Sequence, residues 1–242
     1  IVAIYSTFLQ RSYDQLIHDI VVQNLDILLA IDRAGIVGAD GETHQGIYDI
    51  SFLRILPKIV LMTPSNELEM WKMLSTGFKH TGLAAVRYPR GYSQGEDIDL
   101  DHSTIEIGKG KIIQKGSKIA YLVFGTLLNV VEKVAKRNGA TLIDMRFVKP
   151  IDEALIIDIC NTHDYIFTVE DNVILGGAGT AVNEVMMKYS LKNNIVNIGV
   201  PDKIIPHGSQ DEILSELGLD EIGIERITNN HVDEMVEITS KN

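Results

Sequence analysis

Residues 27–35 of the 242-residue chain read Ile27-Leu28-Leu29-Ala30-Ile31-Asp32-Arg33-Ala34-Gly35. Five consecutive apolar residues are typical of a strand that is covered on both faces, as strands of parallel sheets are. The charged pair that follows begins a long loop, which is rich in glycine and ends at Gly46. Because ligands of open parallel sheets bind beyond the carboxyl ends of the strands, this loop is the first candidate for a functional site.

Apolar runs of strand length alternate with helical patterns on both sides of this segment. The alternation indicates βαβ units, and therefore an α/β fold with mostly parallel sheets that are flanked by helices. The predicted strands lie at residues 1–5, 27–31, 59–62, 84–88, 119–124, 141–144, 165–169 and 195–198.

The composition changes between Gly91 and Lys118, where large apolar residues are few and an acidic run occupies residues 96–101. We interpret this stretch as the connection between two α/β domains, which we place at residues 1–105 and 106–242. The opening run Ile1–Tyr5 is apolar throughout and is predicted to be a buried strand with a neighbour on each side. We therefore expect further residues upstream of the chain and an incomplete first domain.

Composition and charge exclude several functional classes. Lys and Arg number 22 against 33 Asp and Glu, so the net charge is −11. An acidic surface repels phosphate backbones and anionic lipids, and neither nucleic acid nor membrane is expected as a partner. Cys160 is the single cysteine, which fits a reducing compartment, and no apolar run reaches the roughly 18 residues of a spanning helix. We expect a cytoplasmic protein, or a plastid protein if the source is a plant.

Loop 34–46 and its preceding arginine combine residue types that bind and process anions. Arg33 is suited to a phosphate or carboxylate clamp, and His44 can transfer a proton near neutral pH. Asp40 lies between them in the sequence. A solvated surface loop is the alternative interpretation, but a loop of this length is uncommon in a compact domain unless it has a function.

Three further stretches are candidates from their residues alone. Arg87-Tyr88-Pro89-Arg90-Gly91 follows a predicted strand and fits an anionic ligand, or else an arginine that lies over a sheet edge. Tyr5–Arg11 begins a helix, where Phe8 either stacks on a cofactor or, as the pattern favours, fills the core. Gly176-Gly177-Ala178-Gly179 resembles a phosphate loop but lacks the G-x-G-x-x-G spacing, which favours a close contact between helix and strand.

Taken together, these motifs resemble those of the 1-deoxy-D-xylulose-5-phosphate synthases, which are transketolase-like thiamine-diphosphate enzymes. The resemblance covers essentially the whole chain and is carried by residues 5–11, 32–41, 43–46, 85–91, 144–150, 176–179 and 183–185. It implies a partial pyrimidine-binding domain followed by a transketolase C-terminal domain. It also implies a transferase that joins pyruvate to D-glyceraldehyde 3-phosphate, releases CO2, and supplies isoprenoid, thiamine and pyridoxal biosynthesis.

The resemblance assigns roles to seven residues. Phe8 is implied in cofactor binding. Three residues are implied in holding the phosphate of the aldehyde, namely Tyr5, Arg33 and Arg90. Three are implied in catalysis, namely His44, Asp40 and Arg11. Phe8 would stack on the aminopyrimidine ring of thiamine diphosphate. His44 would assist proton transfer, while Arg11 and Asp40 would pair to enclose the intermediate.

Other features of the family have no counterpart in this sequence. The Gly-Asp-Gly motif for Mg2+ and the diphosphate is absent, as is the glutamate that activates the aminopyrimidine. We therefore expect no metal ligands in this chain, a missing N-terminal part as its partner, a homodimer, and no activity of the chain alone. The alternatives are a β-type subunit of a two-chain transketolase or 2-oxoacid dehydrogenase, or a non-catalytic dimerisation module.

Overall fold

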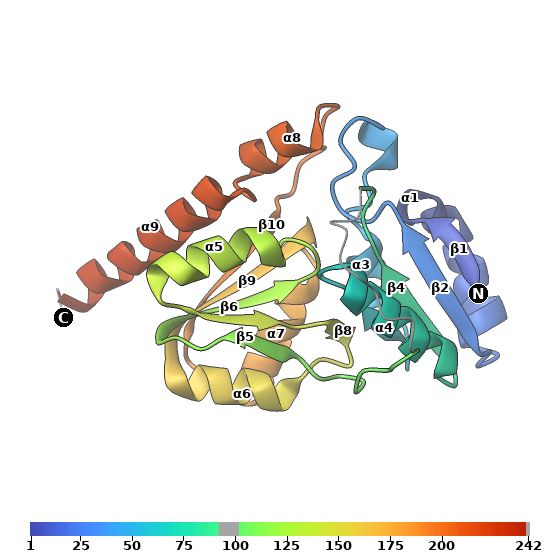
Figure 1. Cartoon of the computed structure of the whole chain (residues 1–242), viewed down its shortest axis with the longest axis horizontal. Coiled ribbons are helices and arrows are strands. Elements are labelled where there is room, and N and C mark those ends of the chain that lie inside the picture. Colours follow the sequence, from blue (N-terminus) through green and yellow to red (C-terminus); the bar gives the residue numbers. More distant parts are fainter. Residues whose placement is uncertain (92–101, 241–242) are drawn as a thin grey trace.

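The computed structural model describes residues 1–91 and 102–240, whose strands form two five-stranded sheets (Figure 1). The orders are β1-β2-β4-β3-β8 and β10-β9-β6-β7-β5. All strand pairs are parallel except β3 with β8 and β5 with β7. The predicted α/β class with mostly parallel sheets is confirmed. The strands are β1 (Val2–Tyr5), β2 (Ile27–Asp32), β3 (Val60–Met62), β4 (Leu83–Arg87), β5 (Lys111–Gln114), β6 (Lys118–Phe124), β7 (Thr141–Asp144), β8 (Phe147–Lys149), β9 (His163–Val173) and β10 (Asn194–Val200).

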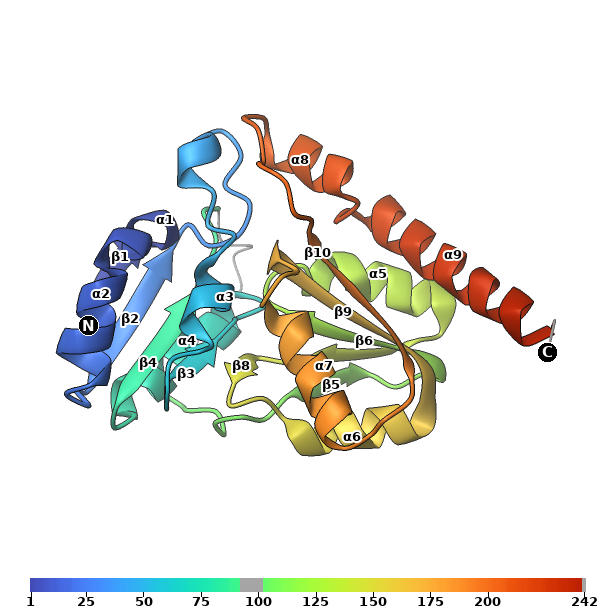
Figure 2. The same ribbon diagram turned by 180° about the vertical axis from the view of Figure 1, so that it is seen from behind.

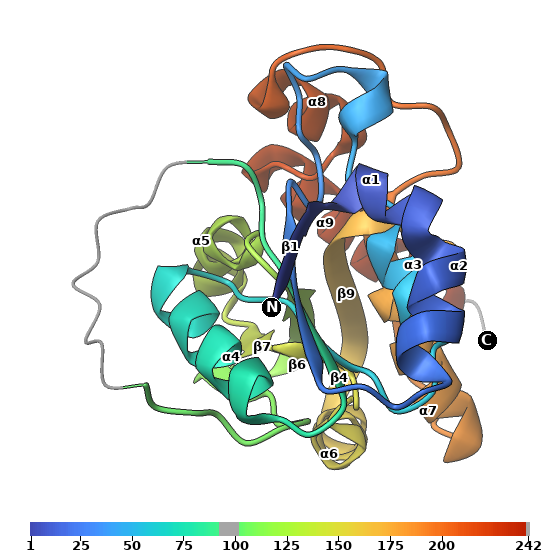
Figure 3. The same ribbon diagram turned by 90° about the vertical axis from the view of Figure 1, so that its right-hand side faces the viewer.

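Helices cover both faces of each sheet (Figures 2 and 3). Helix α4 packs on one face of the first sheet, and the helical segments between β1 and β2 pack with α3 on the other. No helix in residues 1–91 and 102–240 is long and apolar enough to cross a membrane. The helices are α1 (Ser6–Leu9), η1 (Gln10–Ser12), α2 (Tyr13–Gln15), η2 (Leu16–Val21), η3 (Glu42–His44), α3 (Asp49–Leu53), α4 (Glu67–Lys79), α5 (Leu128–Asn138), α6 (Glu153–Thr162), α7 (Ala178–Lys188), α8 (Gln210–Leu217) and α9 (Glu221–Ser240).

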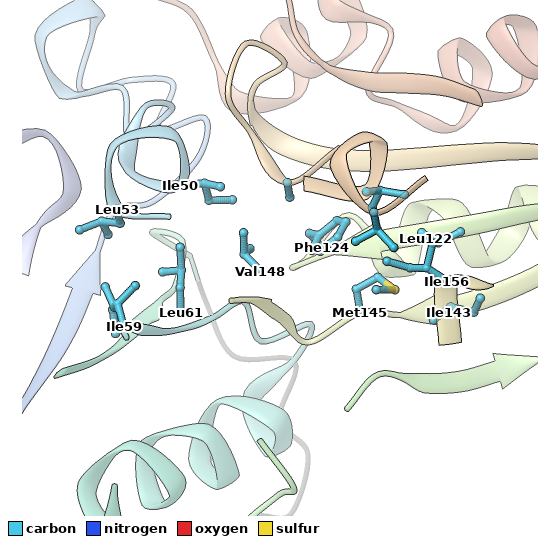
Figure 4. Close-up of a cluster of buried hydrophobic side chains, with 14 of the residues drawn as sticks. Ile50, Leu53, Ile59, Leu61, Leu122, Phe124, Ile143, Met145, Val148 and Ile156 are labelled. Carbon is cyan, nitrogen blue, oxygen red and sulfur yellow. The ribbon is translucent and has the colours of Figure 1, made fainter. Parts of the chain in front are cut away.

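Side chains of β6 alternate between two cores, as a strand that is covered on both faces requires. Leu122 and Phe124 belong to one apolar cluster, whereas Tyr121 and Val123 belong to another that includes residues of α5 and α9. The first cluster continues into the other sheet, where it takes in Leu61. Figure 4 shows this shared core, with Ile50 and Leu61 on one side of Val148 and Phe124 on the other. The two sheets are therefore joined by a continuous apolar core.

The chain crosses between the sheets after β7. Strand β8 leaves the second half and pairs antiparallel with β3 of the first sheet. The predicted boundary between residues 105 and 106 stays a prediction. Residues 92–101 of the expected connection, with the acidic run, lie outside the described residues.

The first strand lies at the outer side of its sheet. Within the described part of the chain, β1 pairs with β2 alone and forms an edge of its sheet. Ile1 is 76% exposed and Val2 is 42% exposed. The predicted strand is confirmed, whereas its second neighbour and its burial stay predictions, because both depend on the residues that we expect upstream of this chain.

Candidate active site

The candidate site lies where β1, β2 and β4 end. These strands are parallel, so their carboxyl ends share one edge of the sheet. Tyr5 closes β1, Arg33 directly follows β2, and Arg90 lies three residues beyond β4. Loop 34–46 rises above this edge beside α8 (Figure 1). The topology thus brings together six of the seven predicted residues, from segments that are far apart in the chain.

Three aromatic rings form a row on this edge. The Tyr5 and Phe8 rings stack with centroids 5.2 Å apart, and the His44 ring meets Phe8 edge-on at 5.6 Å. The Arg33 guanidinium lies over the Tyr5 ring, with Cζ 4.4 Å from its centroid. The pattern of the residues favoured a place in the core for Phe8, which is wrong because this residue is 46% exposed. Phe8 therefore lies at the surface of the candidate site, between Tyr5 and His44.

Asp40 holds two arginines. Its carboxylate forms ion pairs with Arg33 and with Arg90, whose Nη1 lies 2.8 Å from Asp40 Oδ1. Two positive charges thus surround one negative charge, which leaves a surplus positive charge for an anion. Arg11 lies in η1 and is exposed, and its predicted pairing with Asp40 is not among the ion pairs of the described residues. That pairing stays a prediction.

The loop's backbone explains why these side chains converge. Arg33 adopts a left-handed conformation with φ +54°, and its N–H donates to the Asp32 carboxylate at 2.6 Å. Gly35 and Gly46 then exchange two backbone hydrogen bonds of 2.7 and 2.9 Å, which close the neck of the loop. At the tip, Thr7 Oγ1 donates to the Thr43 carbonyl at 2.8 Å. His44 is thereby held beside the start of the first helix.

Arg87, the first arginine of the Arg87–Gly91 motif, is not available to a ligand. It is 4% exposed, and its guanidinium donates to Asp49 at 2.9 Å and to Asp171 at 2.5 Å. The proximity of both carboxylates raises the pKa of Arg87 despite its burial. Sequence reasoning missed both partners, because they come from α3 and from β9 in the other sheet and share no local pattern with Arg87.

The glycine-rich turn before α7 already binds a carboxyl group of the chain itself. The backbone N–H groups of Ala178 and Gly179 donate to the Glu170 carboxylate at 2.7 and 2.8 Å. A Cβ on Gly179 would lie 2.5 Å from Thr168 Oγ1. The preferred interpretation, a close contact between helix and strand, is confirmed for this turn. Burial raises the pKa of Glu170 to about 8.

Metal ligands do not gather in the described ranges 1–91 and 102–240. Within them, no group of three or more His, Cys, Asp or Glu side chains is arranged to hold a metal ion.

Comparisons with known proteins divide the chain into two domains. The family model described as "Transketolase, pyrimidine binding domain" matches residues 1–94, and "Transketolase, C-terminal domain" matches residues 108–224. A solved structure titled "Split gene transketolase, inactive beta4 tetramer" is 22% identical with a TM-score of 0.84, and it covers 94% of this chain and 74% of its own. Transketolase from Campylobacter jejuni is 14% identical with a TM-score of 0.70, over 94% of this chain and 35% of its own. The fold is therefore that of two transketolase-like domains.

Relatives by sequence identify a narrower family among the proteins with transketolase-like domains. The 1-deoxy-D-xylulose-5-phosphate synthase of Vibrio campbellii is 54% identical over 232 residues, which is 96% of this chain and 37% of the relative. That of Pseudomonas fluorescens is 54% identical over 225 residues, which is 93% of this chain and 36% of the relative. The chain belongs to the family of 1-deoxy-D-xylulose-5-phosphate synthases, and it spans little more than a third of the length of these relatives.

Proposed function

We propose that this chain forms the pyrimidine-binding and C-terminal part of a thiamine-diphosphate-dependent transferase that joins pyruvate to D-glyceraldehyde 3-phosphate. The products are 1-deoxy-D-xylulose 5-phosphate and CO2. The observation that carries the proposal is the convergence of Tyr5, Arg33 and Arg90 on the edge where Phe8 and His44 lie. The family's printed name supports the choice of reaction.

The arginine pair is suited to the phosphate of the aldehyde. Arg33 and Arg90 come from different loops, yet both contact Asp40, so their guanidinium groups already face one position. A phosphate carries charge and acceptor oxygens that match two guanidinium groups. Arg33 lies over the ring of Tyr5, and the hydroxyl group of this tyrosine would supply a further hydrogen-bond donor for the phosphate. Asp40 keeps the two cations together before the substrate arrives.

The residues present fit the aminopyrimidine end of the cofactor. Phe8 is half-exposed and lies between two other rings, which is a suitable platform for a planar heterocycle. Among the residues that the structure describes, the buried atoms Ser6 Oγ and Gln45 Nε2 nearby have no hydrogen-bond partner. Thiamine diphosphate, when bound, would supply the electron sink for decarboxylation. We place Mg2+, the diphosphate site and the activating glutamate in a part of the enzyme outside this chain.

The roles of the chain's own residues follow from these positions. Arg33, Arg90 and Tyr5 would hold the aldehyde phosphate, and this would orient its carbonyl toward Phe8. His44, in edge contact with Phe8, would give or take a proton at the substrate carbonyl. Asp40 and Arg11 would enclose the reacting group. The rest of the proposal comprises a homodimer, a cytoplasmic location, and a place in isoprenoid and thiamine biosynthesis.

Reconstitution tests the proposed function. The chain is combined with the remaining, N-terminal portion of the Vibrio campbellii synthase, and we call this assembly the reconstituted synthase. With thiamine diphosphate and Mg2+, it is expected to release CO2 from pyruvate and to form the five-carbon sugar phosphate from glyceraldehyde 3-phosphate. Labelled CO2 and mass spectrometry of the sugar phosphate measure the two products. A folded, assembled complex without either product would contradict the proposal.

Replacing Arg33 by Ala in the reconstituted synthase is expected to raise the KM for glyceraldehyde 3-phosphate. Loss of one charged hydrogen-bonding group costs about 1.5–3 kcal/mol, which is roughly a 10- to 150-fold increase. With D-glyceraldehyde, which lacks the phosphate, the same variant is expected to behave like the wild type. Arg226→Ala on the exposed surface of α9 is the matched control. An equal loss with both aldehydes would contradict phosphate recognition by Arg33.

A further inference from the structure

We propose that Asp171, a residue of the C-terminal sheet, is a positioning residue of the anion site. It would act through Arg87 and Gly35, which together hold the neck of loop 34–46 and thereby Arg33, Asp40 and His44. Its consequence for substrate recognition rests on the proposed function. The inference gives the second domain a part in recognition in addition to its role in packing.

The first observation is a chain of buried polar contacts between the two halves. Asp171 Oδ1 accepts a hydrogen bond of 2.5 Å from Arg87 Nη1, and Arg87 Nη2 lies 3.3 Å from the Gly46 carbonyl oxygen. Asp171 is 7% exposed and Arg87 is 4% exposed, so water is largely excluded from this chain of contacts. A charge-assisted hydrogen bond in such surroundings is both strong and directional. Asp171 therefore fixes the guanidinium that holds one side of the neck.

The second observation concerns the other side of the neck. A Cβ on Gly35 would lie only 2.1 Å from Asp171 Oδ2, so the carboxylate rests directly against this glycine. Gly35 has φ +78°, a conformation that side-chain-bearing residues rarely adopt. Gly35 and Gly46 are also hydrogen-bonded to each other in both directions. The Asp171 carboxylate thus supports both sides of the neck: it contacts Gly35 directly and reaches Gly46 through Arg87.

The third observation links the neck to the arginine of the site. A Cβ on Gly46 would lie 2.1 Å from the Arg33 carbonyl oxygen, so the two backbones are in close contact. A shift of Gly46 must therefore move Arg33 or open a gap beside it. Arg33 in turn contacts Tyr5 and Asp40. Displacement of the neck would reach the anion site through this contact.

Further contacts show that the C-terminal half holds the loop at more than its neck. Gln210 Nε2 donates to the Ile36 carbonyl at 2.7 Å, and Val173 N–H donates to the Ile47 carbonyl at 2.8 Å. These bonds restrain the loop on both sides of the Gly35–Gly46 bridge. They should preserve the overall fold when Asp171 alone is changed, so that its effect on position becomes measurable.

Asp171→Asn in the reconstituted synthase tests the inference. Asparagine keeps the shape but removes the charge, while Asp49 still neutralises Arg87. We expect the ratio of kcat/KM for glyceraldehyde 3-phosphate to that for D-glyceraldehyde to fall about tenfold. Hydrogen exchange of residues 36–45 should accelerate severalfold relative to that of β6. Asp164→Asn, on the same strand but exposed, is the matched control and should leave both quantities unchanged.

Two outcomes would overturn the inference. The first is an unchanged ratio with unchanged exchange of the loop, and the second is an increase in exchange that is uniform over the chain, which indicates a role in overall stability alone. Gly35→Ala provides an independent variant, because its methyl group must displace the Asp171 carboxylate. It should lower the same ratio, and a wild-type ratio would count against the inference. If wild-type synthase makes no product, the proposed function fails, whereas the exchange experiment still decides whether Asp171 holds the loop.

Discussion

Replacing Arg87 by Met is expected to lower the free energy of unfolding by about 3–5 kcal/mol. The guanidinium is buried between Asp49 and Asp171, which are themselves buried. Methionine fills a similar volume but leaves both carboxylates without their cation. Burial already raises the pKa of Asp49 in the presence of Arg87, which shows how costly its charge is in this position. Removal of the arginine leaves that cost uncompensated.

Denaturant unfolding of the wild-type chain and of the Arg87→Met variant measures this loss of unfolding free energy. Arg90→Met is the matched control, because Arg90 belongs to the same motif and also pairs with an aspartate. Its side chain is 50% exposed, so its replacement should cost less than about 1 kcal/mol. Equal losses for the two variants would show that the buried cluster is not what distinguishes these arginines.

The stability of the wild-type chain is expected to decrease with rising pH because of Glu170. Burial raises its pKa from an ordinary 4.5 to about 8, although the N–H groups of Gly179 and Ala178 oppose this shift. Between those values the folded chain holds a proton that the unfolded chain has released. Over this range the free energy of unfolding falls by up to about 1.4 kcal/mol per pH unit, because only the folded chain still binds the proton. Above pH 8 the folded chain releases the proton as well, and the loss levels off. The contribution of Glu170 to stability is therefore complete only at low pH.

Glu170→Gln isolates this contribution. Glutamine has no proton to lose, so its unfolding free energy should lack the part of the slope that comes from residue 170. Asp144 contributes in the same direction, since burial raises its pKa to about 6, so the comparison is made between pH 6 and pH 8. Denaturant unfolding at several pH values measures the slopes, with exposed Glu216→Gln as the control. Parallel curves for Glu170→Gln and the wild type would contradict the prediction.

Local sequence pattern identified the long apolar strands and missed a short one. The runs at residues 27–31 and 119–124 became central strands, since strands that are covered on both faces must be apolar on both. Strand β8 was missed, because three residues before a proline carry no periodic signal.

The segments of the candidate site were predictable from local pattern, because each follows a strand end or begins a helix, and parallel strands bring such positions to one edge. The roles of single residues came from the resemblance to the family. The environment of each residue was not predictable. Phe8 lies on the surface of the site although its pattern suited the core. Arg87 and Arg90 are three residues apart in one motif, yet one is buried and the other is half-exposed.

By itself the sequence determined the α/β class and the residues available for an anion site, because apolar runs and the motifs that follow them are local properties of the chain. Only the tertiary structure decided which arginine is free to bind and how the loop is held. The partner that buries Arg87 is Asp171, 84 residues away and in the other sheet. No local pattern encodes that contact, since it forms only when the shared core brings the two sheets together.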